Sequence, residues 1–103
     1  GKAIMVLGIS FTMARTATAF TGGGAVSIEY ATSGTDVCAT IAAAVITGAS
    51  GTTVTFRTPS DISDSAVADI QAKVLQITNA TAAFAAGTGT AIAEISYVVV
   101  DQA

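Results

Sequence analysis

The stretch Thr16-Ala-Thr-Ala-Phe20-Thr-Gly22-Gly-Gly24-Ala-Val26-Ser-Ile28-Glu-Tyr30 joins a phenylalanine, three glycines and an alternating segment that ends at a tyrosine. A similar arrangement returns from Thr81 to Tyr97, with a second phenylalanine, two glycines and a second alternating segment. Glycine adopts positive φ easily, so each cluster predicts a turn or bulge that leads into a strand. We interpret the two stretches as equivalent hairpins of one β domain, held by nine structural anchors: Phe20, Gly22, Gly23, Gly24, Tyr30, Phe84, Gly87, Gly89 and Tyr97.

Each phenylalanine directly precedes a glycine turn, so we expect the rings of Phe20 and Phe84 to be buried as plugs at the ends of the core. Stacking of a ligand is the alternative, but a chain with six aromatic residues and no tryptophan supplies a poor sugar-binding platform. A glycine-rich loop can also cradle phosphate, which requires a following helix N-terminus. A strand is expected there instead, so the sequence does not indicate a phosphate site.

The composition indicates one domain, residues 1–103, that lies against other molecules. Hydrophobic residues make up 51% of the chain and charged residues 11%, against roughly 25% charged in ordinary soluble domains. Seven acidic and four basic side chains cannot cover the large surface of so small a domain. We therefore expect a subunit of an assembly, and a homo-oligomer, which we take to be a trimer.

Neither nucleic acid nor a membrane is expected as a partner. The net charge is −3, and the four cations (Lys2, Arg15, Arg57 and Lys73) form no stripe that would neutralise phosphates, so no nucleic acid is expected. The apolar run from Ala3 to Met13 is too short for a bilayer, which needs about 20 residues, and it alternates like a strand, so no membrane is expected. The single cysteine, Cys38, is expected to be a small buried side chain.

Alternation with a period of two predicts strands over residues 4–14, 25–31, 52–58, 73–78 and 91–100. We expect these large side chains to share a face within their strands: Met5, Leu7, Ile9, Phe11 and Met13; Val26, Ile28 and Tyr30; Val54 and Phe56; Leu75 and Ile77; Ala93, Ile95, Tyr97 and Val99. Val54 and Phe56 are expected to point inward. The last strand is apolar on both faces, which predicts a central or covered position.

Two segments are less regular. Residues 37–47 are rich in alanine, which favours helix, but Ile41, Ala43 and Val45 also alternate, and the neighbouring strands favour an extended strand. After Pro59, polar capping residues predict a short helix or a wide turn near residues 62–72. The predicted fold class is all-β, an antiparallel β-sandwich or jelly-roll-like barrel of about six to eight short strands.

The chain lacks histidine, which removes the commonest general base and metal ligand and excludes Ser-His-Asp, Cys-His and ordinary zinc sites. Asp61, Asp64 and Asp69 match no calcium loop and are interpreted as caps of a solvated turn. Glu29 and Glu94 could pair as a hydrolytic acid and base, but outward strand positions explain them. We expect no catalytic residue, no metal site, no cofactor and no enzymatic activity.

Three stretches together carry a family resemblance: Ala19–Tyr30, Ile41–Gly48, and Ile77–Gly89 leading into Ile95–Val100. They resemble small structural proteins of tailed bacteriophage virions. The resemblance implies a non-enzymatic β-sandwich, either a capsid decoration (cement) protein or a minor capsid subunit that stabilises the shell. It implies a virion location after assembly in the host cytoplasm, with the major capsid protein or other virion proteins as partners. The alternatives are a tail tube, fibre or extracellular filament subunit, and a glycan- or receptor-binding module.

Overall fold

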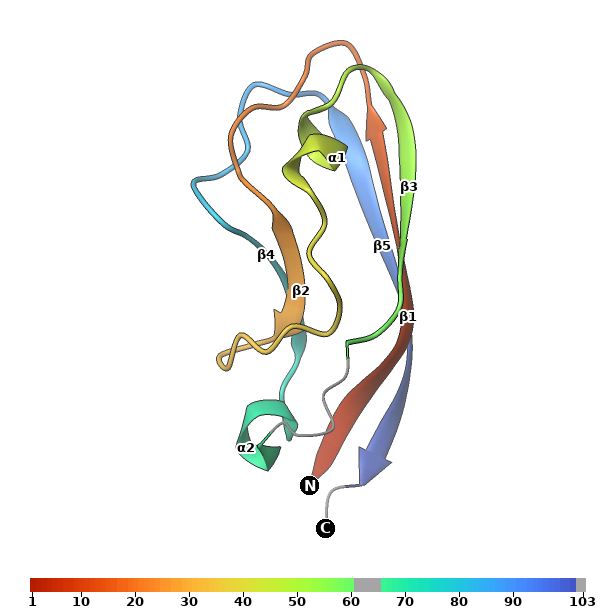
Figure 1. Cartoon of the computed structure of the whole chain (residues 1–103), viewed down its shortest axis with the longest axis vertical. Coiled ribbons are helices and arrows are strands. Elements are labelled where there is room, and N and C mark those ends of the chain that lie inside the picture. The colour runs from red at the N-terminus through yellow and green to blue at the C-terminus, as the bar shows by residue number, and fades with distance from the viewer. Residues whose placement is uncertain (61–65, 102–103) are drawn as a thin grey trace.

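The computed structural model describes residues 1–60 and 66–101 as a mostly β chain in two facing layers (Figure 1). One layer has the strand order β3-β1-β5 and is formed by β1 (Lys2–Arg15), β3 (Gly51–Arg57) and β5 (Gly89–Asp101). The other layer pairs β2 (Val26–Tyr30) with β4 (Leu75–Asn79). All three strand pairs are antiparallel, as expected. Neither sheet closes, and the described residues form five strands rather than six to eight, so the expected jelly-roll-like barrel is not seen.

The core lies between β1 and β2. Ile9, Phe11 and Met13 project from the upper part of β1 and are buried against the inner face of the second layer. That inner face is formed by Val26, Ile28 and Tyr30, as the sequence predicts, because alternating side chains of a strand project to opposite faces. Tyr30 has no exposed surface, and its hydroxyl donates a hydrogen bond to the backbone carbonyl of Ile4, which ties the second layer to β1.

The lower half of β1 does not follow the predicted alternation. Its register against β5 shifts between Val6 and Gly8, which makes Leu7 an extra, unpaired residue, a β-bulge. The bulge reverses which side chains point inward, so Val6 is buried whereas Met5 and Leu7 are exposed. The expectation that Met5 and Leu7 share the buried face of Ile9 is therefore wrong.

The expected strand over residues 37–47 is wrong: residues 37–42 form only isolated bridges, at Cys38 and Ile41, and residues 43–47 form the short helix α1 (Ala43–Thr47). Arg15, at the end of β1, binds α1 and the segment that joins α1 to β3. The guanidinium donates to the backbone carbonyls of Ala49 and Val45, both at 2.6 Å, and to Thr53 Oγ1 at 2.9 Å. These bonds satisfy carbonyls at the C-terminal end of α1 that have no partner within the helix. Residues 37–50 cross one side of the molecule, at the front of Figure 1.

The strands at the two edges of the first layer are oriented differently from the prediction. Val54 and Phe56 of β3 were expected to point inward, but Phe56 is 75% exposed and Val54 is half exposed. β5 was expected to be central or covered, but among the described residues it is an edge strand that pairs with β1 alone. Two side chains of the last strand that were expected to share a face, Tyr97 and Val99, are also more than half exposed.

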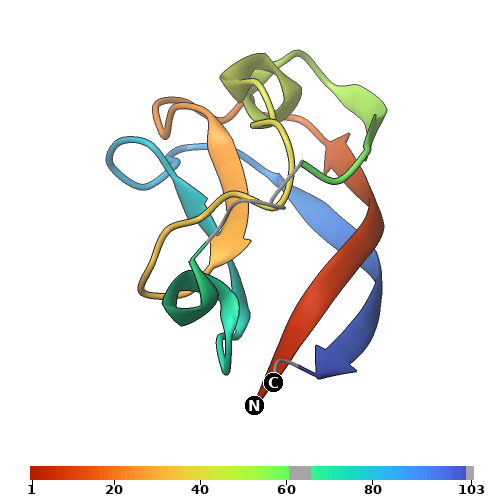
Figure 2. The same cartoon turned by 60° about the horizontal axis from the view of Figure 1, so that its bottom comes forward.

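The start of β1 and the end of β5 lie together at one end of an elongated molecule of 50 × 24 × 17 Å (Figure 2). Lys2 pairs with Asp101 in the β1–β5 ladder, and their side chains form an exposed salt bridge of 2.6 Å. The helix α2 (Val67–Ile70) agrees with the short helix predicted near residues 62–72; residues 61–65 lie outside the described part of the chain. The amide of Ala72 then donates to the carbonyl of Lys2 at 2.8 Å, which joins this end to β1.

Candidate functional site

Two connections at the opposite end of the molecule contain most of the predicted anchors. The first arch (residues 16–25) joins β1 to β2, and the second arch (residues 80–88) joins β4 to β5. Each arch passes from one sheet to the other, so the predicted hairpins are wrong: consecutive strands here face each other and do not pair. The arches lie side by side, because Thr21 and Ala85 exchange backbone hydrogen bonds of 2.9 and 3.0 Å.

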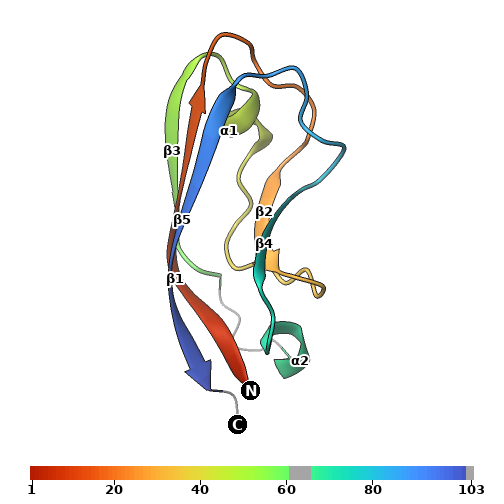
Figure 3. The same ribbon diagram turned by 180° about the vertical axis from the view of Figure 1, so that it is seen from behind.

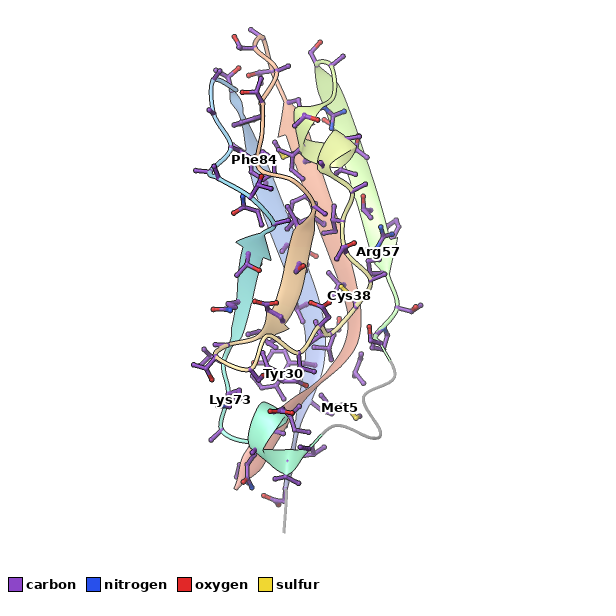
Figure 4. The ribbon with its side chains drawn as sticks, turned by 60° about the vertical axis from the view of Figure 1, so that its left-hand side comes forward. Met5, Tyr30, Cys38, Arg57, Lys73 and Phe84 are labelled. Carbon is purple, nitrogen blue, oxygen red and sulfur yellow. The ribbon has the colours of Figure 1, made fainter. Side chains whose placement is uncertain are left out.

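Each phenylalanine packs on the glycine of the other arch. A Cβ atom added to Gly23 would lie 2.2 Å from the ring of Phe84, and one added to Gly87 would lie 2.0 Å from the ring of Phe20. Both rings are only partly buried and cover the same end of the core, near the label of Phe84 in Figure 4. The prediction of fully buried plugs at the ends of the core is therefore corrected to a crossed pair at one end.

The glycines of the first arch have the positive φ that the sequence predicts, and the arch leads into β2. Gly22, Gly23 and Gly24 have φ values of 72°, 78° and 70°, a region that other residues rarely adopt. Gly89 has φ of 152°, and an added Cβ would meet the backbone oxygen of Ala14 at 2.2 Å, so this glycine allows β5 to begin against β1.

Asn79 is a structural residue of the arches that the sequence interpretation missed. Its side-chain amide lies within hydrogen-bonding distance of three backbone carbonyls, those of Gly23, Thr81 and Ala82, at 2.9, 3.2 and 2.9 Å. It therefore links the end of β4 to both arches. Its position directly before the second arch was the available signal, since asparagine commonly bonds to nearby backbone in turns.

The outer face of the first layer carries exposed large apolar side chains and is uncovered within the described residues. Because paired residues of neighbouring strands project to the same face, the register places two rows across the sheet. Phe56, Ser10 and Glu94 form one row, and Val54, Thr12 and Ile92 form the other. We call these six residues the outer patch. Phe56, Val54 and Ile92 are largely exposed, and Glu94 carries the single charge of the patch.

The side of the molecule formed by the free edges of β4 and β5 is open (Figure 3). A cavity of about 290 Å³ lies there between the layers. Of the lining residues that the structure describes, Thr90 alone has a polar side chain; the rest are apolar or glycine, including Phe11, Phe20, Ile77, Phe84, Ala91 and Ala93. Ile77 pairs with the buried Ile28 and so faces inward, yet it is 52% exposed because nothing covers this side. We call this region the open groove.

Two reactive groups lie inside the core. Tyr30 and Cys38 are 0% and 2% exposed, and their places are labelled in Figure 4. Burial raises the pKa of the Tyr30 hydroxyl, because the phenolate would lose its hydration. Burial also raises the pKa of the Cys38 thiol, and the positive charge of Arg57 opposes this effect in part. Both groups therefore stay protonated at neutral pH and act as packing residues, which agrees with the interpretation of Cys38.

The carboxylates do not assemble into a reactive pair. Glu29 Oε1 accepts hydrogen bonds from Gln76 (2.9 Å) and Thr78 (3.2 Å) on the outer face of the second layer. Glu94 belongs to the outer patch of the first layer, so the two carboxylates lie on opposite sides of the molecule. Asp61 and Asp64 fall outside the described residues; of the third predicted aspartate, Asp69, the backbone carbonyl accepts a bond from Ser33 Oγ at 2.7 Å.

Across residues 1–60 and 66–101, no group of three or more His, Cys, Asp or Glu side chains lies close enough to hold a metal ion. Within the same residues, neither α1 nor α2 approaches the length and apolar character of a membrane-spanning helix. No family model, curated protein or solved structure shows significant similarity to the chain. The function is therefore argued from the outer patch and the open groove.

Proposed function

We propose that this protein is a non-enzymatic structural subunit that docks onto a larger protein assembly through the outer patch. The observation that carries the proposal is the exposure of Phe56, Val54 and Ile92 on one sheet face, where Ser10 and Thr12 of the central strand lie between them and Glu94 is the single charge. Large apolar residues exposed on one face of a small domain mark interaction surfaces, because their burial removes apolar area from water. The broad face of a three-stranded sheet suits a protein partner better than a small ligand.

The form of assembly that we propose is a virion shell, with the protein as a capsid decoration or minor capsid subunit and the major capsid protein as partner. The support for the virion is the sequence resemblance, and the support for a docking role is the outer patch. The subunit would act as cement: a protein that binds only the assembled shell stabilises it by mass action. In the shell, neighbouring subunits would cover the exposed edges and faces of the two layers.

A subunit of a tail, fibre or filament is the second candidate, and one observation favours it. Both outer strands of the first layer, β3 and β5, have a free edge among the described residues, and two different free edges allow copies to add head to tail. A discrete particle size in solution favours the decoration role, whereas an open-ended size distribution favours the filament. The lining of the cavity does not favour a glycan site, which would need several converging polar groups.

The test is co-sedimentation with shells of the phage that encodes the chain, assembled without this protein. We expect Phe56→Ser to weaken binding to the shells strongly, since a largely exposed ring contributes to docking and little to the fold. Val67→Ser is the control, because Val67 is an apolar residue that is 51% exposed but lies on α2, away from the outer patch. Equal binding by both variants and the unchanged protein would contradict the proposal, as would no binding to shells at all.

A further inference from the structure

The open groove exposes side chains that belong to the inside of the fold. Because Ile9 of β1 is buried, its partner Ile95 faces inward, and so do the alternate residues Ala91, Ala93, Tyr97 and Val99 of β5. Tyr97 is nevertheless 57% exposed and Val99 is 55% exposed. These inward-facing side chains at a free strand edge show that the space between the two layers is not covered on this side by the described residues.

The edge of β5 lacks the features by which proteins prevent strands from pairing. Its 13 residues contain no proline, no lysine and no arginine, whereas free edges are commonly blocked by proline, by lysine or by a bulge. The bulge of this sheet lies on β1, the central strand, and so does not protect the edge. Of the two acidic residues on β5, Asp101 is paired with Lys2, and Glu94 faces the outer patch.

We propose that the open groove is closed by a second copy of this chain, with the two β5 strands paired antiparallel about a two-fold axis that passes through Ile95. Ile95 is the middle residue of Gly89–Asp101, so this register uses the whole edge. In the same layer, the sheet would continue as β3-β1-β5-β5-β1-β3. Such an interface is isologous and closed, which is the commonest form of homo-oligomer. This pair replaces the expected trimer as the proposed oligomer.

The sequence of β5 is complementary to itself in this register. Large side chains meet small ones on the inner face: Tyr97 lies opposite Ala93 of the second copy, and Val99 lies opposite Ala91. On the outer face, Ile92 meets Val98, and Glu94 meets Ser96, so the two carboxylates are not placed opposite each other. Directly opposed residues of antiparallel strands have Cβ atoms about 4.5–5.5 Å apart, which is close enough for these pairs to touch.

The cavity provides room for the tyrosine. Ala91 and Ala93 line the cavity of about 290 Å³, and in the proposed register they lie opposite Val99 and Tyr97 of the second copy. The ring of Tyr97 from each copy therefore lies at the mouth of the other copy's cavity, between Ala93 of β5 and Ile77 of β4. A tyrosine in such a place keeps its hydroxyl at the wet rim and buries its ring, which is its usual role at interfaces.

The available area is sufficient for a stable pair. A strand of 13 residues at about 3.3 Å per residue is about 43 Å long. The open side spans both layers, which lie along the 24 Å axis of the molecule, so this face measures roughly 1,000 Å² per copy. A contact that covers about half of it on each copy reaches the roughly 1,000 Å² in total that specific interfaces need. The inference does not depend on the proposed function, although two joined copies would present two outer patches on one continuous face.

The first experiment is sedimentation velocity over a concentration series, with Tyr97→Ala as the test variant and Val67→Ala as the control. The unchanged protein and Val67→Ala should form a dimer, and Tyr97→Ala should raise the dissociation constant at least about tenfold, as for a central aromatic contact. Tyr97 is already exposed in the single chain, so the circular dichroism spectrum of the Tyr97→Ala variant should match that of the unchanged protein. A chain that stays monomeric at every concentration, or a dimer that tolerates Tyr97→Ala, overturns the proposal.

The second experiment fixes the register by disulfide cross-linking in a Cys38→Ala background. Ile95→Cys would lie opposite itself, within the Cα separation of 4.4–6.8 Å that a disulfide requires. Glu94→Cys is the control, because each residue 94 lies opposite residue 96 of the other copy, so the two residues 94 are offset by two positions along the strands and are about 8 Å apart. Rapid oxidation to a dimer is expected for Ile95→Cys alone. Cross-linking of both variants or of neither, or loss of the dimer with Phe56→Ser, shows that another surface pairs.

Discussion

The crossed contacts of the two arches give the sharpest test of the fold, through Gly23→Ala. The new methyl group would lie 2.2 Å from a ring carbon of Phe84, and the backbone there has φ of 78°. Left-handed backbone costs about 1–2 kcal/mol for an L-residue. Displacing a half-buried phenylalanine adds about 2 kcal/mol, roughly half of the 3–5 kcal/mol for truncating a buried one. We therefore expect the free energy of unfolding to fall by about 3–4 kcal/mol.

Gly22→Ala is the matched control for this substitution. Gly22 has a similar φ of 72°, but an added Cβ would find only one atom within 4 Å, the oxygen of Ala83 at 3.9 Å. The control should therefore lose only the backbone contribution of about 1–2 kcal/mol. Urea unfolding followed by far-ultraviolet circular dichroism measures both values. A difference of about 2 kcal/mol also corresponds to a separation of roughly 8–16 °C in Tm for a domain of this size.

A double-mutant cycle separates the ring contact from the backbone effect. Once Phe84→Ala has removed the ring, Gly23→Ala should cost only its backbone contribution, which gives a coupling energy of about 2 kcal/mol. Gly87→Ala with Phe20→Ala is the mirror experiment, and Gly87 lies outside the left-handed region, so its cost should be the clash alone. The reasoning is refuted if Gly22→Ala and Gly23→Ala cost the same, or if the cycle is additive.

Two further predictions concern the buried reactive groups. Tyr30→Phe removes the bond to the Ile4 carbonyl and should cost about 1–2 kcal/mol by urea unfolding; no loss would show that this bond does not join the layers. Burial raises the pKa of Tyr30 above its ordinary value of 10.0, so the stabilisation is complete below pH 10 and declines as the pH rises above it, because the unfolded chain ionises first. Part of this alkaline loss of stability should be missing in Tyr30→Phe. An identical pH profile for the two proteins would show that Tyr30 does not cause the loss. Cys38 should react with a thiol reagent at least about a hundredfold more slowly in native buffer than in denaturant, since labelling requires opening of the core; rapid native labelling would contradict its burial.

Local pattern was enough to predict β2 and the positive φ of Gly22, Gly23 and Gly24. Val26, Ile28 and Tyr30 alternate without interruption, and all three are buried as expected. The three consecutive glycines indicated positive φ because no other residue adopts it so readily, and the structure has it at all three. In these places the conformation depends on the residues themselves and on their immediate neighbours.

The errors arise where alternation alone cannot say which face is inside. In β3, Val54 and Phe56 do share a face, but that face is the outer one, because the register with β1 places them beside Ser10 and Thr12. In β1, the alternation is interrupted at Leu7, and the adjacent Gly8 was the available signal, since glycine inside a strand often marks a bulge. Both outcomes depend on the partner strand, which periodicity does not contain.

The arrangement of the two arches depends on contacts between residues that are distant in the sequence. The sequence places Phe20 beside Gly22 and Phe84 beside Gly87, which favours two separate, self-contained turns. In the structure each ring packs on the other arch, more than 60 residues away. The open groove could not be predicted either, because the apolar character of both faces of β5 was taken as a sign of cover by a neighbour. That cover is absent from the single chain and is what the second copy is proposed to supply.

The crossed arrangement of the arches also restricts how this sequence can diverge. Gly23 can become larger only if the residue at position 84 becomes smaller, and the same holds for Gly87 and position 20. In distant relatives, we expect positions 23 and 84 to change together, and positions 20 and 87 to change together, with little correlation between the two pairs. Stretches that read as simple repeats of alanine, glycine and threonine would then contain two long-range covarying pairs, and exchanging one whole pair should be better tolerated than changing either member.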